Sequence, residues 1–170
     1  MATVPSFDTW LAGERPTAAK LNKNLRDAGN FLKAAPFGWG YRNAAMTLPD
    51  ATWTDVAFDA EKADTDSMFS TSTGFTIVTP GWYTLRAGVR FPNNSAGYRG
   101  CRLRVNNVDA DVVYSPPATG FSCTVRADAD AYCNAGDTVT FGVYSNGAGS
   151  LSLLVAQPHY TFLRARWMSA

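Results

Sequence analysis

The sequence has little of the chemistry that enzymes and metal centres use. It contains one histidine, His159, and three cysteines, Cys101, Cys123 and Cys133, whose positions lack metal-ligand spacing. It has no phosphate-cradling glycine loop and no supported serine–histidine–aspartate motif. A lone histidine in an expected strand is more often structural than catalytic. We therefore expect a protein that has no enzymatic activity and needs no cofactor.

Charge and hydropathy set further limits. The 15 Lys and Arg residues nearly balance the 14 Asp and Glu residues, whereas nucleic-acid binding usually needs a clustered basic face. The densest basic stretch, residues 99–104, alternates with small and apolar residues and is expected to form a solvated strand face. No run approaches the ~18 apolar residues of a membrane-spanning helix. The first residues do not resemble a secretory signal. We expect no nucleic-acid partner, no membrane insertion and no such signal in this sequence.

Alternating aspartates are the remaining polar candidates. Asp109 and Asp111 lie on one expected strand, and Asp128 and Asp130 on another. Such acids could supply oxygen ligands to Ca²⁺ or form the carboxylate pair of a glycosidase. Alternating acids on an exposed strand are mostly solvated, however, and we expect no metal site. The three cysteines alternate in phase with apolar neighbours, so we expect buried free thiols.

The first 16 residues form a distinct arm. They show neither helical nor strand periodicity, yet they carry three large apolar side chains, Phe7, Trp10 and Leu11. A segment of this kind has no core of its own. We therefore expect the arm to dock onto another protein.

A helix is predicted over residues 18–34, with Thr17 as its N-cap. Leu21, Leu25 and Leu32 recur, together with two alanines, at alternating spacings of three and four residues. This is the pattern of a coiled-coil seam. An isolated helix of this length is marginal in water. The seam is therefore expected to pack either on copies of itself or on the domain that follows.

From residue 42 onward the hydrophobic period is two. Residues 34–41 are expected to be a breaker-rich linker, and residues 59–66 a polar loop. The expected strands are residues 52–58, 68–72, 75–78, 82–91, 98–105, 108–114, 121–133, 138–144, 151–155 and 159–168, with tight turns at Asn106-Asn107 and Asn146-Gly147. This pattern predicts a mostly β sandwich or jelly roll at residues 37–170, preceded by an arm and α-helix at residues 1–36.

The β region resembles the C1q/TNF-like jelly roll. The resemblance is carried by Phe75, Pro80-Gly81-Trp82-Tyr83, the basic strand 99–106, the segment 135–139 and an aromatic strand at 160–167. It implies a homotrimer of antiparallel jelly rolls that bury aromatic rings against one another. The trimer-interface candidates are Trp82, Tyr144, Tyr160 and Phe162 in the jelly roll, and Leu21, Leu25 and Leu32 in the helix.

The N-terminal region is similar to a segment common in minor tail proteins of phages of actinobacteria. The matching residues are Trp10-Leu11-Ala12-Gly13-Glu14, Thr17-Ala18-Ala19, Leu21-Asn22, Leu25-Arg26-Asp27 and Phe31-Leu32. This resemblance implies a virion protein whose residues 1–36 contact other tail or capsid proteins. Phe7, Trp10 and Leu11 are the anchor candidates.

Together the two resemblances favour a trimeric, non-enzymatic virion surface protein. It would be a minor tail or fibre-like protein that helps attachment to the host surface, with cell-surface glycan as a partner. Loops 92–97, 115–120 and 145–150 are the expected contacts, and Asn93, Asn94, Tyr98 and Asn146 are the candidate residues. A trimeric capsid decoration protein is the alternative, and a depolymerase is a third hypothesis.

Overall fold

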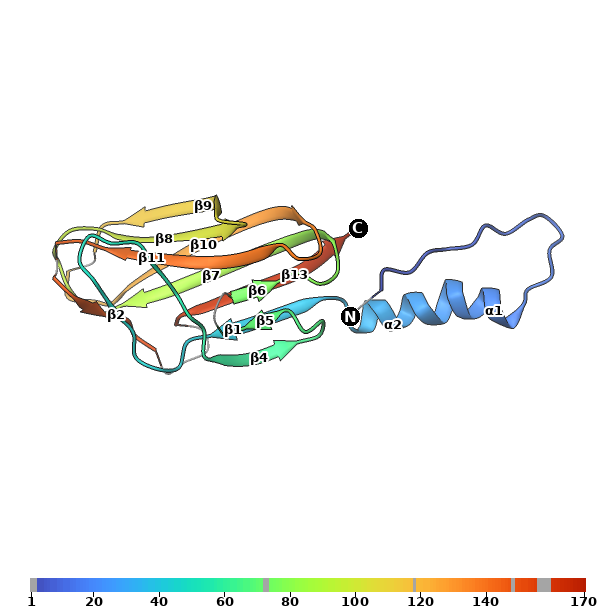
Figure 1. The fold of residues 1–170 in the computed structure, drawn as a ribbon, viewed down its shortest axis with the longest axis horizontal. Coiled ribbons are helices and arrows are strands. Elements are labelled where there is room, and N and C mark those ends of the chain that lie inside the picture. Colours follow the sequence, from blue (N-terminus) through green and yellow to red (C-terminus); the bar gives the residue numbers. More distant parts are fainter. Residues whose placement is uncertain (1–2, 72–73, 118, 148, 156–159) are drawn as a thin grey trace.

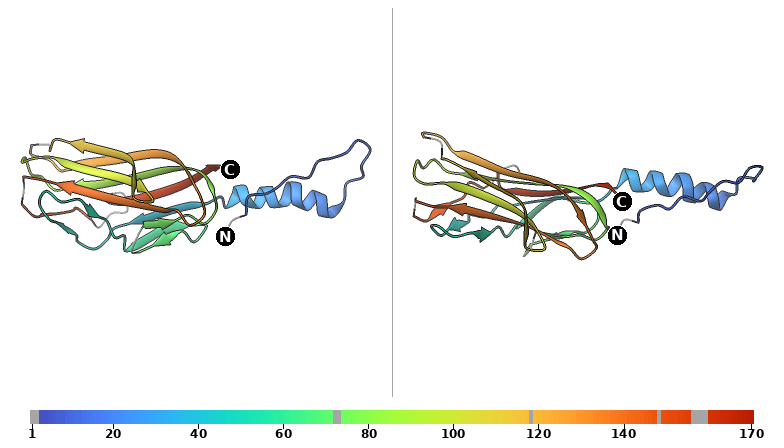
Figure 2. Two further views of the ribbon diagram at one scale, coloured as in Figure 1. Left: turned by 45° about the horizontal axis from the view of Figure 1, so that its top comes forward. Right: turned by 90° about the horizontal axis from the view of Figure 1, so that it is seen from above.

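The computed structural model describes residues 3–71, 74–117, 119–147, 149–155 and 160–170. Two antiparallel sheets pack face to face as a sandwich, and a helix projects from one end of it (Figure 1, Figure 2). The C-terminus lies at the same end as the helix (Figure 1). No helix among the described residues has the length and apolarity needed to cross a membrane.

The first sheet has five strands. In spatial order they are β10 (Cys123–Cys133), β7 (Gly81–Phe91), β13 (Phe162–Ser169), β1 (Phe37–Tyr41) and β4 (Ala60–Asp64). The second sheet has the order β5 (Phe69–Ser70), β6 (Gly74–Thr76), β11 (Thr138–Ser145), β8 (Arg99–Val105) and β9 (Val108–Ser115), with β3 (Thr54–Asp55) also on β11. A further pair joins β12 (Leu151–Ser152) to β2 (Thr47–Leu48). The strand pairs of both sheets are antiparallel, and the expected mostly β jelly roll is confirmed.

The core lies between the two sheets and follows from alternation along the strands. In β7, Tyr83, Leu85 and Val89 are fully buried, whereas Trp82 and Arg86 point to solvent. Strands β8 and β11 supply the opposing apolar layer. Each fully buried apolar side chain of this size stabilises the fold by ~1.5–3 kcal/mol. The sandwich therefore carries its own hydrophobic core.

All three cysteines lie in this core as free thiols, as the sequence predicted. Burial raises the pKa of Cys101 to about 12 and that of Cys133 to about 11. Both thiols are therefore protonated at neutral pH and behave as small apolar side chains.

Strand β1 corrects the expected linker at residues 34–41. Its two glycines face the core: a Cβ at Gly38 would lie 2.8 Å from Phe75 Cε1, and one at Gly40 would lie 2.5 Å from Phe69 Cε2. The glycines are thus places where aromatic rings pack directly on the backbone, and they do not break the strand. Strand β4 likewise replaces an expected polar loop. It carries polar side chains because it is an edge strand.

The predicted turns have different outcomes. Asn106 and Asn107 both have positive φ, 50° and 64°, and join β8 to β9 as the expected hairpin. The hairpin predicted at Asn146-Gly147 is wrong, because β12 pairs with β2 and not with β11. His159, the expected start of the last strand, lies outside the described residues, and β13 begins at Phe162.

Candidate binding surfaces

The N-terminal helix points away from the sandwich, and its C-terminal end adjoins the sheets (Figure 1, Figure 2). It consists of α1 (Ala18–Leu21), a π-helical turn η1 (Asn22–Asp27) and α2 (Ala28–Lys33). The Thr17 hydroxyl accepts a hydrogen bond from the Lys20 N–H (3.2 Å), which confirms the predicted N-cap.

The arm returns along one side of the helix. The Asp8 N–H donates to Asn24 Oδ1 (2.9 Å), and Asn24 Nδ2 donates to the Asp8 carbonyl oxygen (3.1 Å). Lys20 Nζ pairs with Glu14 (2.7 Å) and lies 4.9 Å from the ring centroid of Trp10. These contacts bury Asn24, so the arm covers one face of the helix.

The leucines of the predicted seam remain largely uncovered. Leu21, Leu25 and Leu32, which we call the leucine stripe, are 39%, 67% and 75% exposed. On another face of the helix, Phe31 packs edge-on against Trp167 of β13, with ring centroids 4.8 Å apart. The β domain therefore holds the base of the helix through Phe31. The leucine stripe does not pack on the β domain. Packing on that domain was one of the two expected arrangements; packing on copies of the helix was the other.

The anchor candidates of the arm are also accessible. Phe7 and Leu11 are 68% and 71% exposed, and Trp10 is 41% exposed beside Lys20. Their anchoring role stays a prediction. The arm and the stripe together give this end of the molecule an unusual amount of exposed apolar surface.

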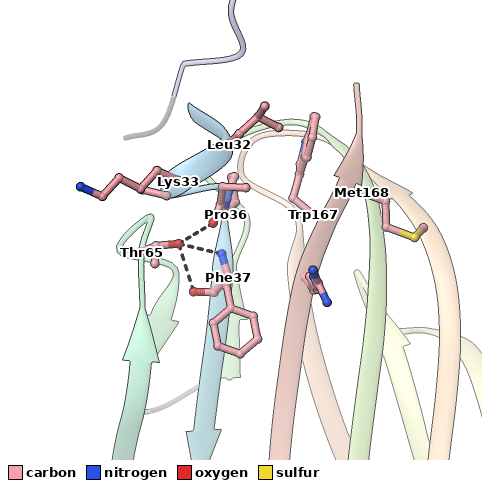
Figure 3. A pocket seen from close by; sticks show the side chains of 10 residues that line it. Leu32, Lys33, Pro36, Phe37, Thr65, Trp167 and Met168 are labelled. Atoms are coloured by element: carbon pink, nitrogen blue, oxygen red, sulfur yellow. Dashed lines mark hydrogen bonds between the residues drawn. The ribbon is translucent and has the colours of Figure 1, made fainter. Parts of the chain in front are cut away.

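A hollow of 570 Å³ lies where the helix meets the sandwich (Figure 3). Thr65 fixes the chain at this point. Its Oγ1 donates to the Ala35 carbonyl oxygen (2.8 Å) and accepts from the Phe37 N–H (2.9 Å). Leu32 of the stripe and the exposed Met168 both line the hollow. The apolar surface of the helix thus continues onto the base of the sandwich.

The opposite end of the sandwich gathers three loops. Phe91 of β7 pairs with Cys123 of β10, while Arg99 of β8 pairs with Ser115 of β9 and Ser145 of β11. The three connections after β7, β9 and β11 therefore leave the sheets at the same end, away from the helix (Figure 1). These are the loops expected to contact the host, although residues 118 and 148 lie outside the described part.

An aromatic pocket of 420 Å³ lies beside these loops, on the outer face of the second sheet. The Trp53 ring centroid is 5.3 Å from that of Tyr144 and 5.9 Å from that of Tyr114. Tyr98 and Tyr114 are more than half exposed, so their rings are accessible to a ligand. We call this site the distal aromatic pocket; it is lined by Trp53, Tyr98, Tyr114, Tyr144 and Asn146. Two predicted contact residues, Tyr98 and Asn146, line it, whereas Asn93 and Asn94 do not.

The pocket exists because β8 has no side chain between two tyrosines. Gly100 pairs with Tyr144 on one side and with Tyr114 on the other. A Cβ at Gly100 would lie 3.0 Å from Tyr114 Cδ1 and 3.4 Å from Trp53 Cη2. The Arg102 guanidinium stacks on Trp53, with Cζ 4.6 Å from the ring centroid. The rings are therefore held in place over bare backbone.

A buried arginine holds the loop backbone beside the pocket. Arg99 is fully buried, and its Nη1 donates to the carbonyl oxygens of Ala96 and Tyr98 (both 3.0 Å). The Tyr98 N–H in turn donates to Asn146 Oδ1 (2.6 Å). Burial lowers the pKa of Arg99, although a guanidinium stays charged. The solvated face expected at residues 99–104 is therefore wrong at Arg99, whose guanidinium binds the loop carbonyls, and at Arg104, which is buried and pairs with Asp55.

The trimer-interface candidates of the jelly roll do not share one face. Trp82, Tyr160 and Phe162 belong to the first sheet or its margin, whereas Tyr144 faces outward from the second sheet. Phe162 is 6% exposed, and the Arg164 guanidinium carbon lies 4.8 Å from its ring centroid. Tyr144 lines the distal aromatic pocket. The part of these residues in a trimer stays a prediction. Trp82 remains 45% exposed.

Comparison with known proteins defines the fold class. No protein-family model and no curated protein matches the sequence. The globular domain of zebrafish complement 1qA superposes with a TM-score of 0.58 at 17% identity, covering 79% of this chain and 99% of that one. Eiger TNF from S. frugiperda gives 0.61 at 14% identity, covering 79% and 94%. Murine APRIL at pH 5.0 gives 0.58 at 13% identity, covering 78% and 98%. The chain thus has a C1q/TNF-like jelly-roll fold.

Proposed function

We propose that this chain is a trimeric surface protein of a bacteriophage virion that binds the host surface without enzymatic action. In this proposal residues 1–36 attach to the tail, and the jelly roll projects outward. One observation carries it: the molecule has accessible binding surfaces at opposite ends. The leucine stripe and arm lie at one end, and the distal aromatic pocket lies at the other.

The leucine stripe supports self-association. Three leucines are exposed to water on one helix face. Burial of their apolar surface would stabilise an assembly by ~25 cal/mol for each Å² removed from water. The spacing of Leu21, Leu25 and Leu32 suits a helix seam formed with other copies of the same helix. C1q/TNF-like domains are typically homotrimeric, which agrees with a three-chain arrangement.

The distal aromatic pocket supports binding to cell-surface glycan. Sugar rings present apolar C–H faces and polar hydroxyl edges, so they suit accessible aromatic rings that lie beside an amide. Tyr98 and Tyr114 supply such rings, and Asn146 supplies the amide. A single site of this kind is weak, but three copies on one particle would bind together and raise the apparent affinity.

Sedimentation with purified actinobacterial cell walls tests the proposal. We expect the full-length protein to bind the walls and Tyr114→Ala to bind them roughly tenfold more weakly or worse, because the loss repeats at every copy. Tyr132→Ala is the matched control, since it removes a similarly exposed tyrosine (49%) from the first sheet. Equal binding by Tyr114→Ala and wild type would exclude the pocket as the contact.

Light scattering tests the assembly. The full-length chain is expected to have the mass of a trimer. A monomeric mass at the concentrations used for wall binding would contradict the trimer and, with it, the multivalent part of the proposal.

A further inference from the structure

The outer face of the first sheet carries a cluster of arginines. Across β10, β7, β13 and β1, the strand registers form one row of Asp128, Arg86, Arg164 and Trp39. The neighbouring row, nearer the helix, is Asp130, Thr84, Arg166 and Phe37. Side chains opposite one another in such rows are direct neighbours. The sheet therefore brings Arg86, Arg164 and Arg166 together.

The acids of these rows do not balance the arginines. Arg86 pairs with Asp128 (3.2 Å), but within the described ranges no ion pair reaches Arg164 or Arg166. Arg86 and Arg164 are also direct cross-strand neighbours. Like charges in that position destabilise a sheet. Among the described residues, Arg164 and Arg166 therefore carry positive charge outside any ion pair.

Arg164 is stacked on an aromatic ring in this cluster. Its guanidinium carbon lies 3.5 Å from the ring centroid of Trp39, and its Nε is buried without a hydrogen-bond partner. Burial lowers the pKa of Arg164, and repulsion from Arg126 and Arg86 lowers it further. A stacked guanidinium loses little freedom when it binds a ligand. The site is thus preorganised for a negative charge.

A hollow of 250 Å³ opens among the three arginines, with Thr84 and Phe37 completing its lining. The Thr84 hydroxyl already donates to Asp130 (2.8 Å), so the three arginines are the remaining donor-bearing side chains of the lining. We propose that this arginine hollow, formed by Arg86, Arg164 and Arg166, binds a small oxyanion of the phosphate or sulfate type.

The chemistry of the arginine hollow fits such an ion. A guanidinium presents its N–H groups as a planar fork that matches two oxygens of a phosphate or sulfate, and these charge-assisted bonds are among the strongest in proteins. The arginines of the adjacent strands β7 and β13 line one concave volume. A compact ion fits such a volume better than a flat protein surface does. The proposal does not rest on host attachment.

Titration of the full-length protein with inorganic phosphate, and separately with sulfate, tests the site by calorimetry at constant ionic strength. We expect saturable binding of at least one of these ions. Arg166→Gln should weaken it about tenfold or more, because Arg166 lines the hollow. Arg166 is exposed, so its replacement should leave the core intact. Arg126→Gln is the matched control, since it removes an exposed arginine of the same face that does not line the hollow. Its affinity should stay within about twofold of wild type.

Two outcomes would overturn the proposal. In the first, neither ion binds saturably; a change of oligomeric mass in Arg166→Gln would then indicate that the arginine hollow is a contact with a second copy. In the second, Arg126→Gln and Arg166→Gln weaken binding equally, which indicates only a diffuse positive field. Failure of wall binding would leave the calorimetric result unaffected, so this proposal and host attachment fail separately.

Discussion

Leu85 in the β domain and Leu25 in the N-terminal helix have opposite surroundings. Leu85 is fully buried between the sheets, whereas Leu25 is 67% exposed on a helix that leaves the sandwich. The sandwich buries the apolar side chains that face inward from its two sheets. The arm covers its side of the helix mainly through polar contacts, such as those of Asp8 with Asn24. The β domain therefore has a hydrophobic core of its own, whereas the leucines of the N-terminal helix are left accessible.

The same substitution in the two regions gives the largest expected contrast. Leu85→Ala should lower the free energy of unfolding of the sandwich by ~2–5 kcal/mol, because it leaves a cavity in a fully buried layer. Leu25→Ala should change that free energy by less than ~0.5 kcal/mol. Guanidinium denaturation followed by tryptophan fluorescence measures both. Equal losses would mean that the helix is part of the same cooperative core.

Removal of the Arg99 guanidinium should have the next largest effect. In Arg99→Met the carbonyl oxygens of Ala96 and Tyr98 lose their buried donors, and we expect a loss of ~1–3 kcal/mol. Hydrogen exchange should also accelerate at the Tyr98 amide, whose partner is Asn146. Arg126→Met, at an exposed arginine, is the control and should have little effect. Unchanged exchange at Tyr98 would contradict the role given to Arg99.

Strand periodicity could be read from the sequence because burial alternates regularly in the β domain. The alternation of apolar residues in β7 predicted that strand correctly. The cysteines alternate in phase with apolar neighbours, and this pattern predicted their burial correctly. Strand β1 was missed because Gly38 and Gly40 resemble breakers until Phe75 and Phe69 are known to pack on them. That information is tertiary, and no local pattern contains it.

The candidate sites were predictable only in part for the same reason. Tyr98 and Asn146 were chosen as loop residues, but the pocket also needs Trp53, Tyr114 and the bare backbone of Gly100. Trp53 lies far from the others in sequence. Tyr114 points outward, opposite the partly buried Val113 on β9, and this alternation was the available signal for it. The charge of Arg99 also led to a wrong prediction of exposure. Arginines are rarely buried unless they are paired, and the loop carbonyl oxygens that bind Arg99 could not be foreseen from the sequence.

Substitution of the leucine stripe provides a sharper test of the difference between the helix and the sandwich. It should leave the stability of the sandwich almost unchanged. The triple variant L21Q/L25Q/L32Q should lower the oligomeric mass measured by light scattering, while the unfolding of the β domain changes by less than ~0.5 kcal/mol. The double variant V108Q/F121Q is the control, because Val108 and Phe121 are as exposed (70% and 75%) but lie on the sandwich. A mass that falls in the control and not in the triple variant would move the association surface to the β domain.

The smallest expected effect is a loosening of the arm at low pH. The Leu11 N–H donates to the Glu14 carboxylate (3.0 Å), and this bond, with Lys20 as the next contribution, lowers the pKa of Glu14 below its ordinary value of 4.5. Because the folded pKa is the lower one, the contact stabilises the arm fully above pH 4.5 and is lost as the pH falls through the folded value. The protection of the Leu11 amide against hydrogen exchange should therefore fall in acid, after correction for the ordinary pH dependence of exchange. The protection of the β7 amides should not fall. In Glu14→Gln the amide oxygen can still accept the bond but cannot titrate, so Leu11 should lose this additional pH dependence. If the protection of Leu11 depends on pH equally in the wild type and in Glu14→Gln, the Glu14 carboxylate does not hold the arm, and its apolar side chains become the remaining candidates.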